Sequence, residues 1–115
     1  MNRFIGSFNY AFKGLVYAFK SQLNFKIHCV VALLVIALGF YVHLAVAEWL
    51  WIVFAIGLVM IIELINTGIE VLVDLVSPQI QPRAGAIKDL AAAAVLISAI
   101  VALVIGLCIF VPRFI

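Results

Sequence analysis

Long apolar runs alternate with short polar stretches along this chain. The run 27–47 carries no Asp, Glu, Lys or Arg, and the run 90–111 has no charged residue and a single hydroxyl, that of Ser98. A third segment, 49–76, is apolar in its first half, gains spaced polar residues in its second half, and meets no proline before Pro78. About 20 apolar residues in a helix cross the hydrocarbon core of a bilayer. The pattern therefore predicts three membrane-spanning helices, at 27–47, 49–76 and 90–111.

The first 26 residues follow a different pattern. Apolar residues recur every three or four positions, with basic and amide residues between them, as on one face of a helix. The recurring set is Phe4, Phe8, Phe12, Leu15, Phe19 and Leu23. Residues 1–26 are therefore expected to form an amphipathic helix that lies in the membrane interface. A cleavable signal peptide is disfavoured, because basic residues continue to Lys26 and no small-residue cleavage site precedes the next span.

The distribution of Lys and Arg predicts how the spans are oriented. Residues 77–86 contain two prolines and a glycine, so we expect a polar loop between the second and third spans. Lys and Arg are concentrated before the first span and around this loop, whereas the turn 43–48 has neither. Because such residues stay on the cytoplasmic side, the N-terminus and the loop are expected in the cytoplasm. The expected location is the bacterial inner membrane.

Composition narrows the classes of protein that fit. Of the 115 residues, 69% are hydrophobic and 10% are charged, whereas soluble domains have about 45–50% and about 25%. The length leaves no room for a separate large catalytic domain, so residues 1–115 are expected to form one all-α membrane domain. The net charge of +2 is too small and too scattered for a nucleic-acid surface. Cys29 and Cys108 lie in apolar runs, so neither a disulfide nor a metal pair is expected.

The polar residues of segment 49–76 point to chemistry. Glu63, Asn66, Glu70 and Asp74 follow one another at intervals of three, four and four residues, which places them within about 80° on one helix face. An ionisable residue at membrane depth costs about 2.5–3.5 kcal/mol on insertion scales and usually marks a functional site. Glu63 and Glu70 are interpreted in that way, because Asn66 shares their face. For Asp74 the solvated end of a long helix is an equally good explanation.

Lys88 and Asp89 follow the predicted loop. They are expected to open the third helix, with Asp89 capping it or interacting with its first amides. Lys88 alone is typical of an anchor at the membrane boundary, but here it faces a row of carboxylates at the same cytoplasmic level. Carboxylates that hold a divalent cation, a deep carboxylate that acts as a base and a positive clamp are what phosphoryl transfer needs. A glycine-rich phosphate loop of the P-loop or protein-kinase type is absent from the sequence.

These motifs closely resemble those of the small prokaryotic diacylglycerol kinase family, which also contains the undecaprenol kinases. Segment 63–74, ELINTGIEVLVD, and segment 88–95, KDLAAAAV, fit the family patterns E-x-x-N-[ST]-x-x-E-x-x-x-D and K-D-x-x-x-A-A-V. The resemblance extends to YAFKG at 10–14 and NFKIH at 24–28. It implies a homotrimer of three-span subunits with an N-terminal surface helix. It also implies that neighbouring subunits share active sites at the cytoplasmic boundary, and that the substrates are ATP and a membrane lipid, with Mg²⁺ as cofactor.

Carried over to this sequence, the resemblance assigns roles to individual residues. Glu63 is expected to be the general base and to contact the lipid, Asn66 to be a polar residue of the reaction centre, and Glu70 to be a metal ligand. Contacts to ATP are expected from Arg3, Tyr10, Gln22, Glu70, Lys88 and Asp89, and Arg3 is also expected to contact the lipid. Where the family usually has a second metal-binding Glu, this chain has Gln22. A neutral amide can offer an oxygen to the metal but not the charge that holds a hard cation.

The sequence thus predicts an ATP-dependent lipid kinase, with diacylglycerol as the favoured acceptor and phosphatidic acid as its product. Undecaprenol is the alternative acceptor within the family, and the stretch 24–28 favours it. In another class of protein, a small proton-coupled transporter could use Glu63 as its proton site. Transporters of this length tend to need four spans, however, and Lys13 and Lys20 interrupt the first segment. A structural subunit of a membrane complex would leave the polar helix face unexplained.

Overall fold

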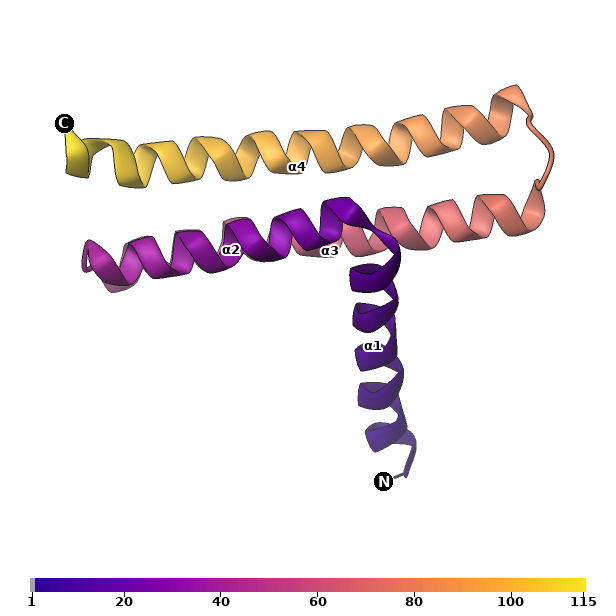
Figure 1. Ribbon diagram of the computed structural model, residues 1–115, viewed down its shortest axis with the longest axis horizontal. Coiled ribbons are helices and arrows are strands. Elements are labelled where there is room, and N and C mark those ends of the chain that lie inside the picture. Colours follow the sequence, from indigo (N-terminus) through magenta and orange to yellow (C-terminus); the bar gives the residue numbers. More distant parts are fainter. Residues whose placement is uncertain (1) are drawn as a thin grey trace.

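The computed structural model describes residues 2–115, and over this range the fold consists of four α-helices. They are α1 (Asn2–Ser21), α2 (Leu23–Tyr41), α3 (Val46–Val76) and α4 (Pro82–Phe114). Helices α2, α3 and α4 run antiparallel to their neighbours in the chain, and α3 contacts both α2 and α4 (Figure 1). Helix α1 leaves this row at a steep angle, so that the N-terminus lies far from α4 (Figure 1). The all-helical class is confirmed.

Three of these helices, α2, α3 and α4, are long and apolar enough to cross a membrane. The number of predicted spans agrees with these three candidates, and the chain has the features of a membrane protein. The bounds differ, because α2 ends at Tyr41 rather than at residue 47 and α3 already begins at Val46. Helices α3 and α4 contain 31 and 33 residues, a length of about 46 and 50 Å. Because the hydrocarbon core is only about 30 Å thick, both helices extend beyond it. The polar end of α3 and the first turns of α4 form part of this excess length.

The start of α4 differs from the prediction. The helix begins at Pro82, inside the segment 77–86 that was expected to be a loop, and Gln81 is its N-cap residue. Proline suits the first helical position, because its φ is preset and the N–H that it lacks would have no partner there. Lys88 and Asp89 consequently lie about two turns inside α4. The prediction that Asp89 caps this helix is wrong.

The junction between α1 and α2 also lies earlier than the apolar pattern indicates. Gln22 has an extended backbone, with φ −117° and ψ 112°, and it separates the two helices as the N-cap residue of α2. Its N–H still bonds to the carbonyl oxygen of Ala18 at 2.9 Å, so the break is a sharp bend rather than a loop. Residues 23–26, expected at the end of the surface helix, belong to α2. The bend aims the Gln22 side chain towards α3.

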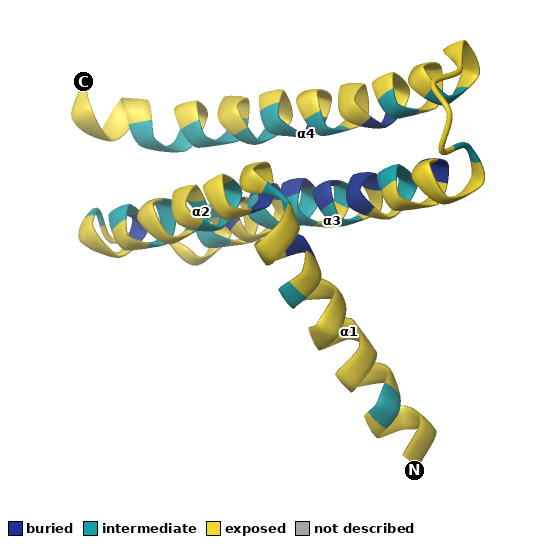
Figure 2. Ribbon diagram, turned by 45° about the vertical axis from the view of Figure 1, so that its right-hand side comes forward, coloured by how far each residue is buried: buried dark blue, intermediate teal, exposed yellow. Residues whose placement is uncertain are grey.

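Helix α3 forms the core of the molecule. Seven of its residues are buried, whereas α2 and α4 have two buried residues each. The buried set of α3 is Ile52, Ala55, Val59, Glu63, Asn66, Thr67 and Val73. Figure 2 shows buried residues in dark blue along α3, while most of α1 and the outer sides of α2 and α4 are exposed. The polar half of α3 therefore lies in the most enclosed part of the chain.

A tight turn sets the register between α2 and α3. His43 has a positive φ of 58°, its N–H bonds to the Phe40 carbonyl, and the Leu44 N–H bonds to the Gly39 carbonyl at 3.1 Å. These two bonds define a Schellman motif, in which glycine usually takes the position held here by His43. The Trp49 ring lies directly over Gly39, at a distance that leaves no room for a Cβ atom. Turn and ring together fix how far α3 is shifted along α2.

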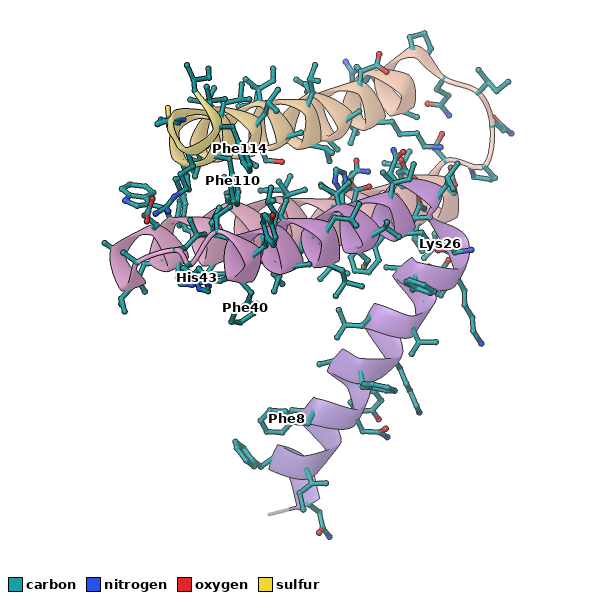
Figure 3. The ribbon with its side chains drawn as sticks, turned by 60° about the vertical axis from the view of Figure 1, so that its left-hand side comes forward. Phe8, Lys26, Phe40, His43, Phe110 and Phe114 are labelled. Carbon is teal, nitrogen blue, oxygen red and sulfur yellow. The ribbon has the colours of Figure 1, made fainter. Side chains whose placement is uncertain are left out.

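The C-terminal end of α4 is fastened to the same turn. The Arg113 guanidinium donates hydrogen bonds to the Val42 carbonyl, at 3.0 Å, and to the Glu48 carboxylate. Glu48 also accepts a bond from the Ala45 N–H at 3.0 Å. Figure 3 shows Phe110 and Phe114 of α4 at this end, together with Phe40 and His43, while Lys26 lies at the opposite end. These Arg113 contacts hold α4 to the α2–α3 turn, at the end of the helix row opposite the polar half of α3.

Candidate active site

The polar half of α3 carries two buried side chains that the helical spacing had placed on one face. Glu63 is only 1% exposed, and Asn66, one turn later, is also buried. Glu70 follows at intermediate exposure and Asp74 is exposed. The face therefore runs from the protein interior to the surface along two to three turns of helix. We define the polar cluster as these three residues, Glu63, Asn66 and Glu70, together with Gln22 at the α1–α2 junction and His28 of α2, which are described below.

Glu63 occupies the deepest position of the cluster. Its Oε2 atom is buried and has no hydrogen-bond partner among residues 2–115. The nearest ionisable group is His28 of α2, with its Nε2 atom 3.7 Å from Oε2. Buried polar atoms in folded proteins nearly always have a hydrogen-bond partner, and burying a carboxylate without one is costly. An oxygen left free in this way is available to a substrate proton.

Glu70 is the centre of a second group of contacts. The Gln22 side-chain amide donates to Glu70 Oε2 at 3.4 Å, and the Asn66 amide donates to Glu70 Oε1 at 3.5 Å. The first contact joins residues 48 positions apart, and it depends on the bend at Gln22. The structure therefore brings Gln22, Asn66 and Glu70 together.

The oxygens around Glu70 have the chemistry that a nucleotide-bound magnesium ion requires. Mg²⁺ is usually held by one or two carboxylates together with substrate phosphates and water. Glu70 supplies a carboxylate, Gln22 an amide oxygen, and Asn66 Oδ1 is a buried oxygen without a hydrogen-bond partner within residues 2–115. Over the same residues, no group of three His, Cys, Asp or Glu side chains is placed to hold a metal. The donors fit a metal that arrives with the nucleotide better than a permanently bound ion.

Lys88 pairs with Asp74, the exposed residue at the end of the polar face. Its Nζ atom is 2.6 Å from Asp74 Oδ1, and the side chains are 40% and 66% exposed. A pocket of about 180 Å³ lies beside the pair, lined by these two residues and the linker 77–81. Pockets that bind small molecules usually have volumes of about 300–1,000 Å³. The pocket offered by a single chain is therefore smaller than a typical small-molecule site.

Three expected nucleotide contacts are not brought to the cluster within one chain. The N-terminal end of α1, which carries Arg3, points away from α3 (Figure 1). Tyr10 is 74% exposed, and its ring lies 5.7 Å below the Lys13 ammonium. Asp89 is exposed on α4. These residues would require a second subunit or a bound nucleotide to join the others.

Sequence reasoning missed the role of His28 in the cluster. In the sequence, His28 is noted only as part of the stretch 24–28. The periodicity of α2 does not determine which residue of α3 the His28 side chain contacts. That contact depends on the register set by the turn at His43. A histidine in an otherwise apolar membrane helix was the available signal, since ionisable residues at such depth usually have a partner.

Comparison with known proteins agrees with these motifs. Residues 9–110 match the sequence model of the prokaryotic diacylglycerol kinase family. The chain is 41% identical over 113 residues to an undecaprenol kinase of Bacillus subtilis (strain 168), covering 98% of this chain and 92% of that protein. It is 41% identical over 107 residues to a diacylglycerol kinase of Synechocystis, covering 92% of this chain and 61% of that protein. Identity to the diacylglycerol kinase of Escherichia coli (strain K12) is 33% over 102 residues, or 89% and 84% of the two chains. The chain therefore belongs to the prokaryotic diacylglycerol kinase family, whose members are lipid kinases that transfer phosphate to a hydroxyl group.

Proposed function

We propose that this protein transfers the γ-phosphoryl group of MgATP to the hydroxyl of a lipid in the inner leaflet of the bacterial inner membrane. The observation that carries the proposal is the polar cluster, in which a buried Glu63 oxygen without a hydrogen-bond partner within residues 2–115 lies one turn before Asn66 of the group around Glu70. A buried carboxylate in a membrane helix is costly and usually marks a functional site. The apolar halves of the helices accommodate the lipid chain in the membrane itself.

Four residues of the cluster, and Lys88 beside it, have a proposed task. Glu63 accepts the hydroxyl proton while the lipid oxygen bonds to the γ-phosphorus and the bond to the β–γ bridging oxygen breaks. Glu70, with Gln22 and Asn66, would hold Mg²⁺, which supplies neutralisation of the phosphate charge. Lys88 leaves its ion pair with Asp74, pairs with the phosphate instead, and so stabilises the negative charge on the transferred group. Because both partners of that ion pair are exposed, the exchange requires no unfolding.

The quaternary structure and membrane placement are part of the proposal. A homotrimer with active sites between subunits is supported by the separation of Arg3, Tyr10 and Asp89 from Glu70 within one chain, and these residues would contact ATP from a neighbouring copy. Phe4 and Phe8 are exposed along α1, which supports a position for that helix in the membrane interface. The basic residues before α2 and around the linker 77–81 support a cytoplasmic active site.

Two lipid acceptors are proposed. Undecaprenol is favoured by the Bacillus subtilis relative, because that protein is named an undecaprenol kinase and aligns with nearly the whole of this chain. Diacylglycerol, the acceptor expected from the sequence, is favoured by the names of the Synechocystis and Escherichia coli relatives. The two acceptors share a primary hydroxyl and differ in their apolar chains, so the reaction centre described above suits both.

A phosphorylation assay tests this function. The purified protein is mixed with labelled MgATP in detergent micelles containing undecaprenol, diacylglycerol or no lipid, and the lipid products are separated. We expect labelled product with at least one lipid, and the ratio of the two kcat/KM values identifies the preferred acceptor. The variant Glu63→Gln serves as the control for protein that is folded but lacks the base. Absence of labelled product with both lipids would contradict the proposed function.

A further inference from the structure

The proposed reaction leaves a proton on Glu63 after every turnover. The carboxyl group must lose this proton before it can act as a base again. Glu63 is 1% exposed and lies on a membrane-spanning helix, so bulk water does not reach it directly. One ionisable side chain approaches its free oxygen: His28 Nε2 lies 3.7 Å from Glu63 Oε2.

We propose that His28 is a proton-relay residue that carries this proton from Glu63 to water; the inference rests on the proposed function. The His28 side chain is 24% exposed and lies in the second turn of α2, near the end of the span that the proposed topology places at the cytoplasmic boundary, so its ring connects the buried carboxylate with water there. The separation of 3.7 Å is longer than a hydrogen bond. A small rotation of the ring brings the two atoms within hydrogen-bond distance.

The proton balance of the relay is simple. The neutral imidazole of His28 accepts the proton of the Glu63 carboxyl group on Nε2, which leaves a Glu63 carboxylate and an imidazolium ion. A proton then leaves the exposed part of the ring to water, and the neutral imidazole is restored. Histidine suits this task because it both accepts and donates a proton near neutral pH.

The surrounding helices offer Glu63 no comparable partner. On α3, Glu70 lies about two turns away and accepts bonds from Gln22 and Asn66. On α2, the Lys26 ammonium lies 5.7 Å over the Phe19 ring rather than at the cluster. Helix α4 has no Asp, Glu, Lys, Arg or His between its Asp89 and Arg113. From the α1 junction only the neutral Gln22 reaches the cluster. His28 is thus the one proton acceptor that contacts Glu63 in the described part of the chain.

The relay acts after phosphoryl transfer, and this timing separates it from a purely structural role. If His28 only held Glu63 in place, its removal would slow the first turnover as much as later ones. If His28 removes the proton from Glu63 after each turnover, a variant without His28 completes its first turnover at the normal rate and its following turnovers slowly. Rapid-quench measurement of labelled lipid product distinguishes the two time courses.

The test uses His28→Asn in the full-length protein, with His43→Asn as the matched control. His43 is the other histidine of the chain, at the far end of α2, where asparagine tolerates its positive φ. We expect His28→Asn to give an initial burst of about one product per active site, followed by a steady-state rate reduced at least about tenfold. His43→Asn should keep the wild-type time course. In a second variant, His28→Ala, added imidazole should restore the steady-state rate.

Several outcomes would overturn the relay. These are an unchanged steady-state rate in His28→Asn, an equal loss in the first and later turnovers, and the failure of imidazole to restore His28→Ala. In each case Glu63→Gln still reports whether the base assignment holds. If the wild-type protein transfers no phosphate, the proposed function is wrong. If Glu63→Gln is fully active, the assignment of the base is wrong. In either case the relay is wrong as well.

Discussion

Lys88 Nζ lies 2.6 Å from Asp74 Oδ1, and this ion pair joins the second turn of α4 to the last turn of α3. Both side chains are substantially exposed, so water and salt screen the pair and it contributes little to stability. The pair therefore keeps the lysine at the polar end of the helices without holding it tightly. An incoming phosphate can replace the Asp74 carboxylate.

This relationship predicts different effects for its two partners. Lys88→Ala removes the positive charge that would meet the nucleotide, and we expect the KM for MgATP to rise by about tenfold or more. Asp74→Asn leaves that charge in place and frees it from its partner, so the KM should change by less than about threefold. Steady-state kinetics at saturating lipid measure both values, with Lys20→Ala as a control for the loss of a basic residue elsewhere. Equal effects of Lys88→Ala and Asp74→Asn would mean that the pair acts as a unit.

Glu63→Gln tests the base. The amide has nearly the same shape as the carboxylate and is less costly to bury, so we expect the fold and the thermal stability in detergent to be retained. Turnover should fall by about 10² or more, the usual contribution of a general base. Near-normal turnover with ATP and lipid saturating would remove Glu63 from this role.

Glu70→Ala separates the metal requirement from base catalysis. Removing the only carboxylate among the proposed ligands should raise the Mg²⁺ concentration needed for half-maximal activity and also lower the maximal rate. Lys88→Ala should leave the Mg²⁺ concentration for half-maximal activity unchanged, because its positive charge is not a metal ligand. The measurement is activity against free Mg²⁺ at fixed ATP. Identical Mg²⁺ curves for wild type and Glu70→Ala would exclude Glu70 from the coordination shell.

The sequence alone could predict the helices and the polar face of α3, because both follow from periodicity within one element. Charge-free runs marked the spans, and intervals of three and four placed Glu63, Asn66 and Glu70 on one side. It could not predict the start of α4, because Pro82 serves as a helix breaker and as a good first residue alike.

Contacts between helices were out of reach for a different reason. The contact between His28 and Glu63 depends on how far α3 is shifted along α2. The geometry of the turn and the packing of side chains determine this shift. The contact between Gln22 and Glu70 was expected from the family resemblance rather than from the residue pattern. Its geometry depends on the extended backbone of a single residue.

Gly39→Ala tests what sets that register. A Cβ atom at this position would lie 2.6 Å from Trp49 Cη2 and 3.0 Å from Leu44 Cδ1, so the Trp49 ring or the helix must shift. Overpacking of this kind usually costs about 1–3 kcal/mol, and we expect a lower unfolding midpoint in detergent. Gly106→Ala, where no atom lies within 4 Å of the added Cβ, is the control and should not lower the midpoint. Equal midpoints would mean that the α2–α3 turn tolerates a different register.

Gln22→Glu tests the position at which this chain departs from the family pattern. The Gln22 amide lies 3.4 Å from Glu70 Oε2, so a carboxylate there adds a charged oxygen beside the proposed metal ligand. Hard divalent cations bind more tightly as ligand charge rises, and the Mg²⁺ concentration for half-maximal activity should fall. The matched control is Gln79→Glu, which adds the same charge on the exposed linker and should leave the Mg²⁺ curve unchanged.

The opposing effect in the Gln22→Glu variant is electrostatic repulsion. Without a metal between them, two carboxylates and the ATP phosphates repel one another, and the nucleotide would bind more weakly. Activity against free Mg²⁺, measured at several ATP concentrations, separates these effects. A shift of the curve to lower Mg²⁺ supports Gln22 as a member of the metal shell, whereas an unchanged curve places it outside. Weaker ATP binding at every Mg²⁺ concentration would instead mean that the nucleotide site depends on the neutral amide, because the added charge then meets phosphate directly.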